Sequence, residues 1–370
     1  MPLPRSWRAP LLKAHRWIAF SAGILLVLNA ATGLLMLAAE PLDEHLNPQL
    51  YKVQQQPAAV PLERLRQALR AQMPSQTFTL HPPTAPDEAM DVLVRGETGW
   101  EGKLWLDPYT GQELGRRARY GLNLEGLFEL HSSLLWGKTG KAILGCVALG
   151  MLLMLASGAL LWWPVRWRNA FSVVLSGARL RALFDLHRVA GASLGLWVMV
   201  CVTTGGLLAY RPALQWINQL AGTQTLEAPK LAATTSSGPV ATLDQMLATA
   251  QAAVPGSRTG VISLAANAKQ PIRIRQKAAD DPHPNGLTSV WLHPQTGAML
   301  RLDPWRTLAP AERSLAWIYP LHTGKLAGAL GLVFTIVGGL ALLGFGISGT
   351  WLWWLRRPKG APQAAQRYIL

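Results

Sequence analysis

Cysteine is scarce in this chain, and the familiar nucleotide-binding motifs are missing. The sequence contains two cysteines, Cys146 and Cys201, and both lie inside long apolar runs. The polar segments therefore carry no disulfide, and thiol redox chemistry is disfavoured as a function. Both cysteines are best interpreted as small apolar side chains of a helix bundle. The sequence has no P-loop, Rossmann glycine fingerprint or flavin motif, which excludes any recognisable site for a nicotinamide donor.

Acidic residues are also few: 20 Asp and Glu stand against 35 Lys and Arg, for a formal net charge of +15. Basic residues gather beside apolar runs, with four in residues 1–16, five in 164–188 and four after Leu355, against one acid, Asp185. Such clusters mark the cytoplasmic ends of membrane-spanning helices. We therefore assign the charge to membrane orientation and predict no nucleic-acid partner.

Four apolar runs are each long enough for the roughly 20 residues that cross a bilayer. The first is too long for a cleaved signal peptide and is expected to remain as a helix. With the basic clusters in the cytoplasm, the long polar segments face the opposite side, which in a bacterial inner membrane is the periplasm. The predicted domains are a cytoplasmic N-terminus with the first span (1–38), a periplasmic segment (39–139), the second span (140–163), a cytoplasmic loop (164–187), the third span (188–210), a periplasmic segment (211–325), the fourth span (326–355) and a cytoplasmic tail (356–370).

The apolar runs occur as repeats with fixed offsets. The stretch from His131 matches the stretch from His322 at an offset of 191, and the stretch from His15 matches that from His187 at an offset of 172. A repeat without gaps predicts a duplicated two-helix unit in a membrane helix bundle. Other aligned residues are Ser157-Gly158 with Ser348-Gly349, Trp162-Trp163 with Trp353-Trp354, Arg16 with Arg188, Gly23 with Gly195, and Thr32-Gly33 with Thr204-Gly205.

Each long polar segment has the pattern of one helix followed by strands. Residues 61–74 and 241–254 carry apolar side chains at helical spacing. The turns DPYTG (107–111) and HPQTG (293–297) occupy equivalent places between strand-like runs. Each segment is therefore predicted to form a small α+β module, close to the lower size limit for independent stability and so packed on the bundle or on its twin. The strand-like runs are 77–80, 89–95 and 102–114 in the first segment, and GVISL, PIRIR and SVWLHPQTGAML in the second.

These features resemble the PepSY-associated transmembrane family. The resemblance rests on modules that end in W-L-x-P-x-T-G, placed after spans that begin with His-Arg and before spans that begin with Leu-His, and it covers His15 to Arg357. That family includes iron-regulated inner-membrane proteins and ferric-siderophore reductases similar to ferrioxamine reductase. The resemblance implies PepSY-like modules, b-type haem as the cofactor, and electron transfer to a ferric siderophore in the periplasm.

Four of the eight histidines stand at the heads of spans and recur between the repeats. We expect His15 and His187 at the cytoplasmic edge, and His131 and His322 at the periplasmic edge. Two neutral imidazoles that face each other across a bundle can ligate a b-type haem. The predicted haem-iron ligands are therefore these two pairs, for two haems. The alternative is that the histidines and nearby glycines serve helix packing alone, although intramembrane ionisable residues are costly and tend to be functional.

Residues near the histidines are compatible with haem. Arg16 and Arg188 are predicted to pair with haem propionates at the cytoplasmic edge. Because His131 lies 32 residues before Trp163, about 48 Å as one unbroken helix, a bend near 137–140 is expected. The tryptophan pairs are assigned to anchoring at the membrane interface. Further candidates are Lys138, Lys141 and Lys325 for propionates, and Ala19, Gly23, Gly191 and Gly195 for close approach of the macrocycle or a helix.

The leading hypothesis is an inner-membrane haem reductase that passes electrons to a periplasmic ferric siderophore and releases ferrous iron. A non-enzymatic regulator or scaffold, whose modules bind peptides or peptidases, is the alternative. A transporter is weaker, because the repeats are parallel and no discontinuous helix is evident. The electron donor is left open between a quinol and a cytoplasmic reductase. No catalytic residue is assigned; His81, His283, His293, Asp280 and Asp281 are candidates for a substrate site, with a solvated loop position as the default for each.

Overall fold

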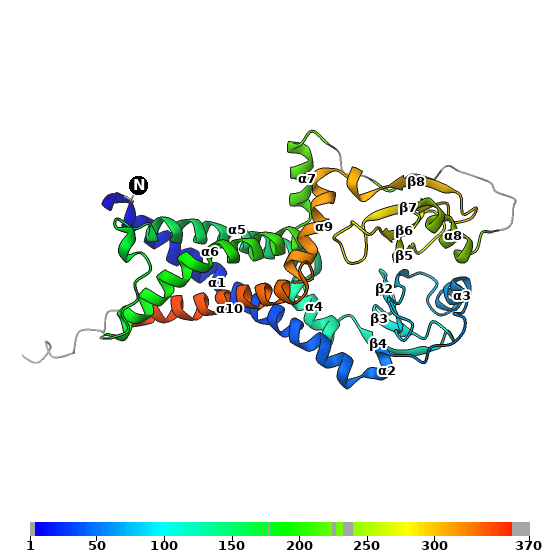
Figure 1. The fold of residues 1–370 in the computed structure, drawn as a ribbon, viewed down its shortest axis with the longest axis horizontal. Coiled ribbons are helices and arrows are strands. Elements are labelled where there is room, and N and C mark those ends of the chain that lie inside the picture. Colours follow the sequence, from blue (N-terminus) through cyan, green and yellow to red (C-terminus); the bar gives the residue numbers. More distant parts are fainter. Residues whose placement is uncertain (1–3, 177, 224–226, 232–239, 357–370) are drawn as a thin grey trace, which may run out of the picture. The chain divides into compact units, whose positions relative to one another are not determined.

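The structure is a computed structural model that describes residues 4–176, 178–223, 227–231 and 240–356, and Figure 1 labels its elements. The predicted cytoplasmic tail lies outside the described residues apart from Arg356. The chain divides into two compact units, which are described separately. The first consists of Met1–Ala31, Val147–Thr203 and Val337–Leu370, and the second of Thr32–Cys146 and Thr204–Ile336.

Among the described residues, four helices are long and apolar enough to cross a membrane, which confirms the prediction of a membrane helix protein. Their apolar residues recur on every face, as expected for helices that meet lipid as well as one another. Little of the most apolar window of each helix is buried, down to 6% in the last. The helices are α1 (Arg5–Leu46), α5 (Gly137–Trp162), α6 (Arg179–Ala209) and α10 (Gly328–Leu355).

The first unit is a bundle made from segments of these four helices (Figure 1). Its core is small: Met151 of α5 and Val198 and Val202 of α6 are buried. Leu26 of α1 and Phe345 of α10 pack against them. All four helices therefore meet at one apolar cluster.

α1 is longer than expected. The predicted first span ends at residue 38, whereas the helix α1 continues through Pro41 to Leu46. A proline inside a helix removes a single backbone hydrogen bond, and here the following turn is held by tertiary contacts. The Asp43 carboxylate accepts two hydrogen bonds from Arg117, at 2.6 and 2.8 Å, and a third from Tyr51.

The second unit contains two modules with the predicted helix-then-strands order. In each, alternate strand residues are buried beneath one helix, so the pattern of apolar side chains explains the packing. Module 1 comprises α3 (Leu62–Gln72), β1 (Thr77–His81), β2 (Met90–Arg95), β3 (Gly102–Leu106) and β4 (Glu113–Ala118), and module 2 comprises α8 (Leu243–Ala253), β5 (Arg258–Leu264), β6 (Ile272–Lys277), β7 (Thr288–Leu292) and β8 (Met299–Asp303).

The two modules share a single antiparallel sheet of eight strands, in the order β4-β3-β2-β1-β5-β6-β7-β8 (Figure 1). The seam is β1 against β5, where Phe78 pairs with Leu264 and Leu80 with Ile262. One hydrophobic core runs under the seam and includes Leu65 of α3 and Met246 of α8. Each module was expected to pack on the bundle or on the other module, and the two modules do pack on each other.

The two module helices cap each other at their N-termini. The first backbone N–H groups of a helix have no partner within that helix. The Asp244 carboxylate of α8 accepts the N–H groups of Leu62 and Glu63 of α3, at 2.9 and 3.0 Å. In return, Glu63 accepts the N–H of Leu243 at 2.9 Å. Each module thus completes a helix of the other.

Three further helices connect the modules to the spans, and a four-residue helix, α2 (Pro48–Tyr51), precedes module 1. α7 (Pro212–Leu220) follows α6 and packs against α9. α4 (Leu124–Ser133) follows module 1, and α9 (Pro310–His322) follows module 2. Two short 3-10 turns complete the described structure, η1 (Trp167–Asn169) after α5 and η2 (Trp305–Thr307) after β8.

Candidate functional site: two pairs of histidines

His131 lies near the end of α4, on a helix separate from the following span. α4 begins at Asn123, whose side chain accepts the Gly126 N–H at 2.8 Å. It ends where Leu134 and Leu135 adopt positive φ angles of 51° and 63°. Such angles are rare for residues with a side chain, and they break the helix before α5. The bend predicted between His131 and the membrane span is therefore present, a few residues earlier than expected.

His322 has the same arrangement on α9. It is the last residue of that helix, and the chain then turns through Gly324 and Gly328, at φ of 75° and 55°, into α10. Gly324 has backbone atoms of Gly331 and Leu332 only 3.0 Å from where a Cβ would stand, so the turn requires glycine. Both histidines thus sit at breaks between a short helix and a span.

Buried polar contacts fix the two short helices. Glu129 of α4 is 3% exposed and pairs with Arg95 and Arg119 of module 1, with the Arg119 bond at 2.8 Å. On the other side, Asn218 of α7 accepts the Ala311 N–H of α9 at 2.9 Å and also binds Glu312. A buried charge that lost its partner would be costly, so these contacts define where each helix stands.

His131 and His322 form the outer pair of histidines, and their rings face each other. The ring centroids of His131 and His322 are 6.3 Å apart, with an angle of 33° between the planes. Nδ1 of His131 lies 3.2 Å from the Thr32 hydroxyl, and Nδ1 of His322 lies 3.1 Å from the Thr204 hydroxyl. In both rings the hydroxyl contact is at Nδ1, and a hydrogen bond at one ring nitrogen orients the imidazole.

A glycine follows each of these threonines and makes room for the histidine. A Cβ on Gly33 would come within 2.9 Å of Cε1 of His131. A Cβ on Gly205 would come within 2.8 Å of Cε1 of His322. Real Cβ atoms essentially never come so close to another atom. In each Thr-Gly pair the threonine hydroxyl therefore contacts the imidazole, and the glycine leaves the space that its ring occupies.

His15 and His187 form the inner pair of histidines. Each has its Nδ1 against a hydroxyl group, as in the outer pair, but the hydroxyl belongs to a serine. Nδ1 of His15 lies 2.9 Å from the Ser157 hydroxyl, and Nδ1 of His187 lies 2.7 Å from the Ser348 hydroxyl. The Ser157 hydroxyl donates its hydrogen to the Met154 carbonyl at 2.9 Å. It can then only accept from the histidine, which places the proton on Nδ1 and leaves the Nε2 lone pair free. Ser348 donates to the Gly344 carbonyl at 2.6 Å, and the same reasoning applies.

His15 and His187 belong to one layer. The two residues lie near enough to interact electrostatically, although they come from different repeats. Open space adjoins the helix faces below them: a Cβ added at Gly23, Gly191 or Gly195 would meet no heavy atom within 4 Å.

The predicted cations near the histidines have different surroundings. Arg188 donates to the Ala170 and Ser172 carbonyls at 2.8 and 2.7 Å, so it holds the loop after α5. The side chain of Arg16, which lies within α1, makes no hydrogen bond or ion pair with another described residue. Lys138, Lys141 and Lys325 are exposed.

The candidates for a substrate site are engaged in separate local contacts. His81 binds Asp91 at 2.7 Å on neighbouring strands, and His293 accepts N–H groups of its own turn, in the role that Asp107 has in module 1. Asp280 pairs with Arg306, and the Asp281 carboxylate accepts two backbone N–H groups of its loop. His283 differs from the others, because its Nδ1 contacts Arg275 and its ring stacks on Tyr319 of α9.

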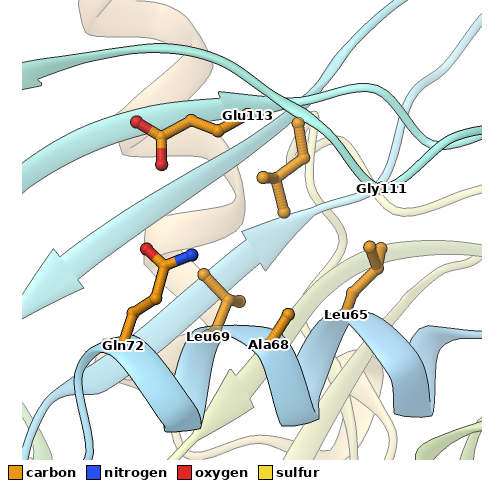
Figure 2. Close-up of a pocket in the computed structure, with 7 residues that line it drawn as sticks. Leu65, Ala68, Leu69, Gln72, Gly111 and Glu113 are labelled. Carbon is orange, nitrogen blue, oxygen red and sulfur yellow. The ribbon is translucent and has the colours of Figure 1, made fainter.

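A small pocket in module 1 is unsuited to a cofactor. It holds about 40 Å³, room for a few water molecules. Figure 2 shows Leu65, Leu69 and Gln72 of α3 along one side and Gly111 and Glu113 on the other. No cluster of three or more His, Cys, Asp or Glu that could hold a metal ion occurs among the described residues.

The family model of the PepSY-associated TM region matches residues 12–356 of the chain. No curated protein matches it.

Proposed function

The chain belongs to the PepSY-associated transmembrane family, and from that membership and its histidine pairs we propose that it is a haem-containing reductase of ferric siderophores. Its place is the bacterial inner membrane, with both termini in the cytoplasm and both modules in the periplasm. The two-helix unit is duplicated, and each layer of histidines takes one residue from each copy. The distance between His131 and His322 carries the proposal.

That distance fits a bis-imidazole metal site. A transition metal holds an imidazole nitrogen at roughly 2 Å, and the ring centre lies about 1 Å behind that nitrogen, so two rings on opposite sides of one ion have centres about 6 Å apart. His131 and His322 are 6.3 Å apart by the same measure. The donor set also suits haem iron, because imidazole is a usual axial ligand.

The hydroxyl residues prepare the histidines for iron. A ligating histidine normally uses its second ring nitrogen to bind a carbonyl, carboxylate or hydroxyl, and this fixes its tautomer and orientation. Thr32 and Thr204 do this for the outer pair, and Ser157 and Ser348 for the inner pair. Arg16, which has no other polar partner among the described residues, remains the better candidate for a haem propionate than Arg188.

A haem ligated by two histidines accepts and releases one electron at a time. Two such layers, one toward each membrane face, would let this chain's residues carry electrons from a cytoplasmic-side donor, a quinol or a reductase, to the periplasm. Ferric iron in the siderophore takes up one electron and becomes ferrous. Hard oxygen ligands hold the less charged ion more weakly, so reduction favours release.

The visible spectrum of the purified full-length protein tests this function. We expect a reducible Soret band and two b haems per chain by pyridine-haemochrome analysis. His131→Ala and His322→Ala should each remove the same haem, and His15→Ala and His187→Ala the other. Loss of the outer haem should abolish reduction of a ferric siderophore while the inner haem remains reducible.

His45→Ala is the matched control, because His45 is exposed at the end of α1 and outside both pairs. It should keep both haems. A wild-type protein with no haem would contradict the proposal and favour a regulator or scaffold. Depletion of different haems by His131→Ala and His322→Ala would contradict the pairing across the two copies.

A further inference from the structure

Module 2 contains a cluster of three arginines and one histidine, which includes the sheet face opposite α8. The alternation PIRIR buries Ile272 and Ile274 in the core and places Arg273 and Arg275 together on the other face of β6. His283 lies in the loop before β7, and its Nδ1 is 3.3 Å from Nη2 of Arg275. Its ring stacks on that of Tyr319 of α9, with the ring centroids 4.9 Å apart. We call Arg211, Arg273, Arg275 and His283 the arginine cluster; Arg211 immediately precedes α7 and interacts electrostatically with the other three.

The two strand arginines are bound to neutral groups. Arg273 donates to the Ser289 hydroxyl through Nε and one Nη, at 2.9 and 2.7 Å. Arg275 donates to the Gly286 carbonyl through Nε at 2.7 Å. In each case the second terminal nitrogen, Nη1, has no partner among the described residues. The Arg211 side chain makes no hydrogen bond to any described residue, so its whole guanidinium group is available.

Nearby acids offset the charge of the cluster only in part: Asp303 acts on Arg273 and Asp281 on Arg275 through their charges, without a direct ion pair to either. The Asp281 carboxylate binds backbone N–H groups of His283 and Leu287, at 2.9 and 2.5 Å. The Asp303 carboxylate binds Arg301 and the Trp291 indole. Burial, together with the charge of Arg273, lowers the pKa of Arg275 to about 10. Several cations with unused donors are therefore held together, at an electrostatic cost that an anion would relieve.

The equivalent face of module 1 carries no such excess. Sheet register aligns the two modules, because Asp91 pairs with Trp105 in one and Arg273 pairs with Trp291 in the other. The acid Asp91 is balanced by Lys103, at 3.2 Å. The next position on this face is Leu93 in module 1 and Arg275 in module 2. The arginine cluster is thus a property of one module and no general requirement of the fold.

The arginine cluster is connected to the outer histidine layer through α9. Tyr319, on which His283 stacks, precedes His322 by three residues, so the two side chains lie one turn apart on the same side of the helix. A ligand on the cluster would therefore lie on the flank of module 2 that adjoins the outer pair.

We propose that the arginine cluster is a binding site for a carboxylate anion. Guanidinium groups match the two oxygens of a carboxylate, and Arg211 with the free nitrogens of Arg273 and Arg275 supplies the donors. Two sources have this chemistry: a soluble carboxylate chelate of iron, or the propionates of the outer haem. The second source, and any role of the site in iron reduction, rests on the proposed function; anion binding itself does not.

Calorimetric titration of the full-length protein in detergent with citrate tests the site. We expect saturable binding that weakens by at least about tenfold in Arg211→Gln, because a charge-assisted hydrogen bond is lost. The Arg211 side chain has no hydrogen-bond partner among the residues that the structure describes, so this variant should remain folded. Lys269→Gln removes the same charge from the exposed loop before β6 and should bind citrate like wild type.

Haem content and the midpoint potential are measured on the same samples to distinguish the two sources. Loss of citrate binding in Arg211→Gln with unchanged haem supports a soluble ligand. No citrate binding by wild type, with a shifted potential or lost haem in Arg211→Gln, supports propionates. No citrate binding by wild type, with haem content and potential unchanged in Arg211→Gln, overturns the proposal. If the protein holds no haem at all, citrate binding still decides the anion site.

Discussion

At the scale of single residues, the four glycines beside the histidines differ in how closely they approach the rings. A Cβ would stand 2.9 Å from the nearest ring atom at Gly33 and 2.8 Å at Gly205, but 3.4 Å at Gly158 and 3.7 Å at Gly349. The last two distances are ordinary van der Waals contacts. The outer histidines are therefore seated more tightly than the inner ones.

This difference predicts unequal responses to alanine. Gly33→Ala should push His131 from its position and deplete the outer haem, roughly as a lost supporting contact lowers metal affinity by 10- to 100-fold. Gly158→Ala, the matched change beside His15, should leave the inner haem nearly intact. Optical titration of haem into the two purified variants measures both affinities. Equal losses would contradict the tighter seating of His131.

His283 should make module 2 sensitive to acid. Burial, and the positive charges of Arg275, Lys277 and Arg211, lower the pKa of His283 to about 3; Tyr319 stacks on its other side. The unfolded chain binds this proton below about pH 6.5, its ordinary value. His283 therefore stabilises the fold fully above pH 6.5, and this contribution is lost as pH falls toward 3.

Within that window one proton changes stability by up to about 1.4 kcal/mol per pH unit. We expect His283→Gln to flatten the pH dependence of the thermal unfolding midpoint between pH 6.5 and pH 4. His45→Ala, a histidine exposed on α1, should keep the wild-type slope. An unchanged slope in His283→Gln would show that His283 is not held neutral in the fold.

At the scale of elements, the mutual caps of α3 and α8 couple the two modules. Asp244 accepts two backbone N–H groups of α3, and Glu63 accepts one of α8. Asp244→Ala should cost about 1–2 kcal/mol of stability, the usual price of losing an N-terminal cap. The measurement is the shift in thermal unfolding midpoint of the full-length protein.

The control for this prediction is Asp87→Ala, which removes an exposed ion pair with Lys52 and should have little effect. The double variant Glu63→Ala/Asp244→Ala should differ from the sum of the single variants, because the two caps lie side by side at the same contact. Additive losses would mean that the two helices are capped independently.

Local patterns in the sequence predicted most of these elements. Apolar period and turn chemistry located α3, α8 and the strands that follow them, and the length from His131 to Trp163 indicated a break before the span. The β1–β5 seam was missed, because local alternation cannot specify which distant strand pairs with which. The extension of α1 past Pro41 was missed because Asp43 finds its partner, Arg117, far along the chain.

The sequence predicted which histidines come together, and it missed the residues that hold them; their role as ligands stays a prediction. The four histidines and their two layers came from the repeats. Thr32-Gly33 and Ser157-Gly158 were visible in the same alignment, yet only as landmarks, since sequence does not tell which helix faces them. The arginine cluster also had a signal, in the PIRIR alternation that places two arginines on one face of a strand.

At the scale of the whole molecule, the charge distribution predicts orientation. Reporter fusions at residue 175 and at the C-terminus should report the cytoplasm, because basic residues flank these ends of the spans. Fusions near residues 85 and 265 should report the periplasm. A cytoplasmic signal from either of the latter would contradict the assignment of the histidine pairs to two membrane faces.

The shared sheet has a consequence for how the protein is made. β1 is bordered by β2 within its own module and by β5 on the other side. β5 is synthesised only after α5 and α6, so a newly made module 1 presents β1 as a bare sheet edge until the second half of the chain follows. Exposed edges recruit foreign strands. Slowed synthesis between the halves should therefore favour mispaired chains, and exchange of modules between two neighbouring nascent chains would satisfy the same edge.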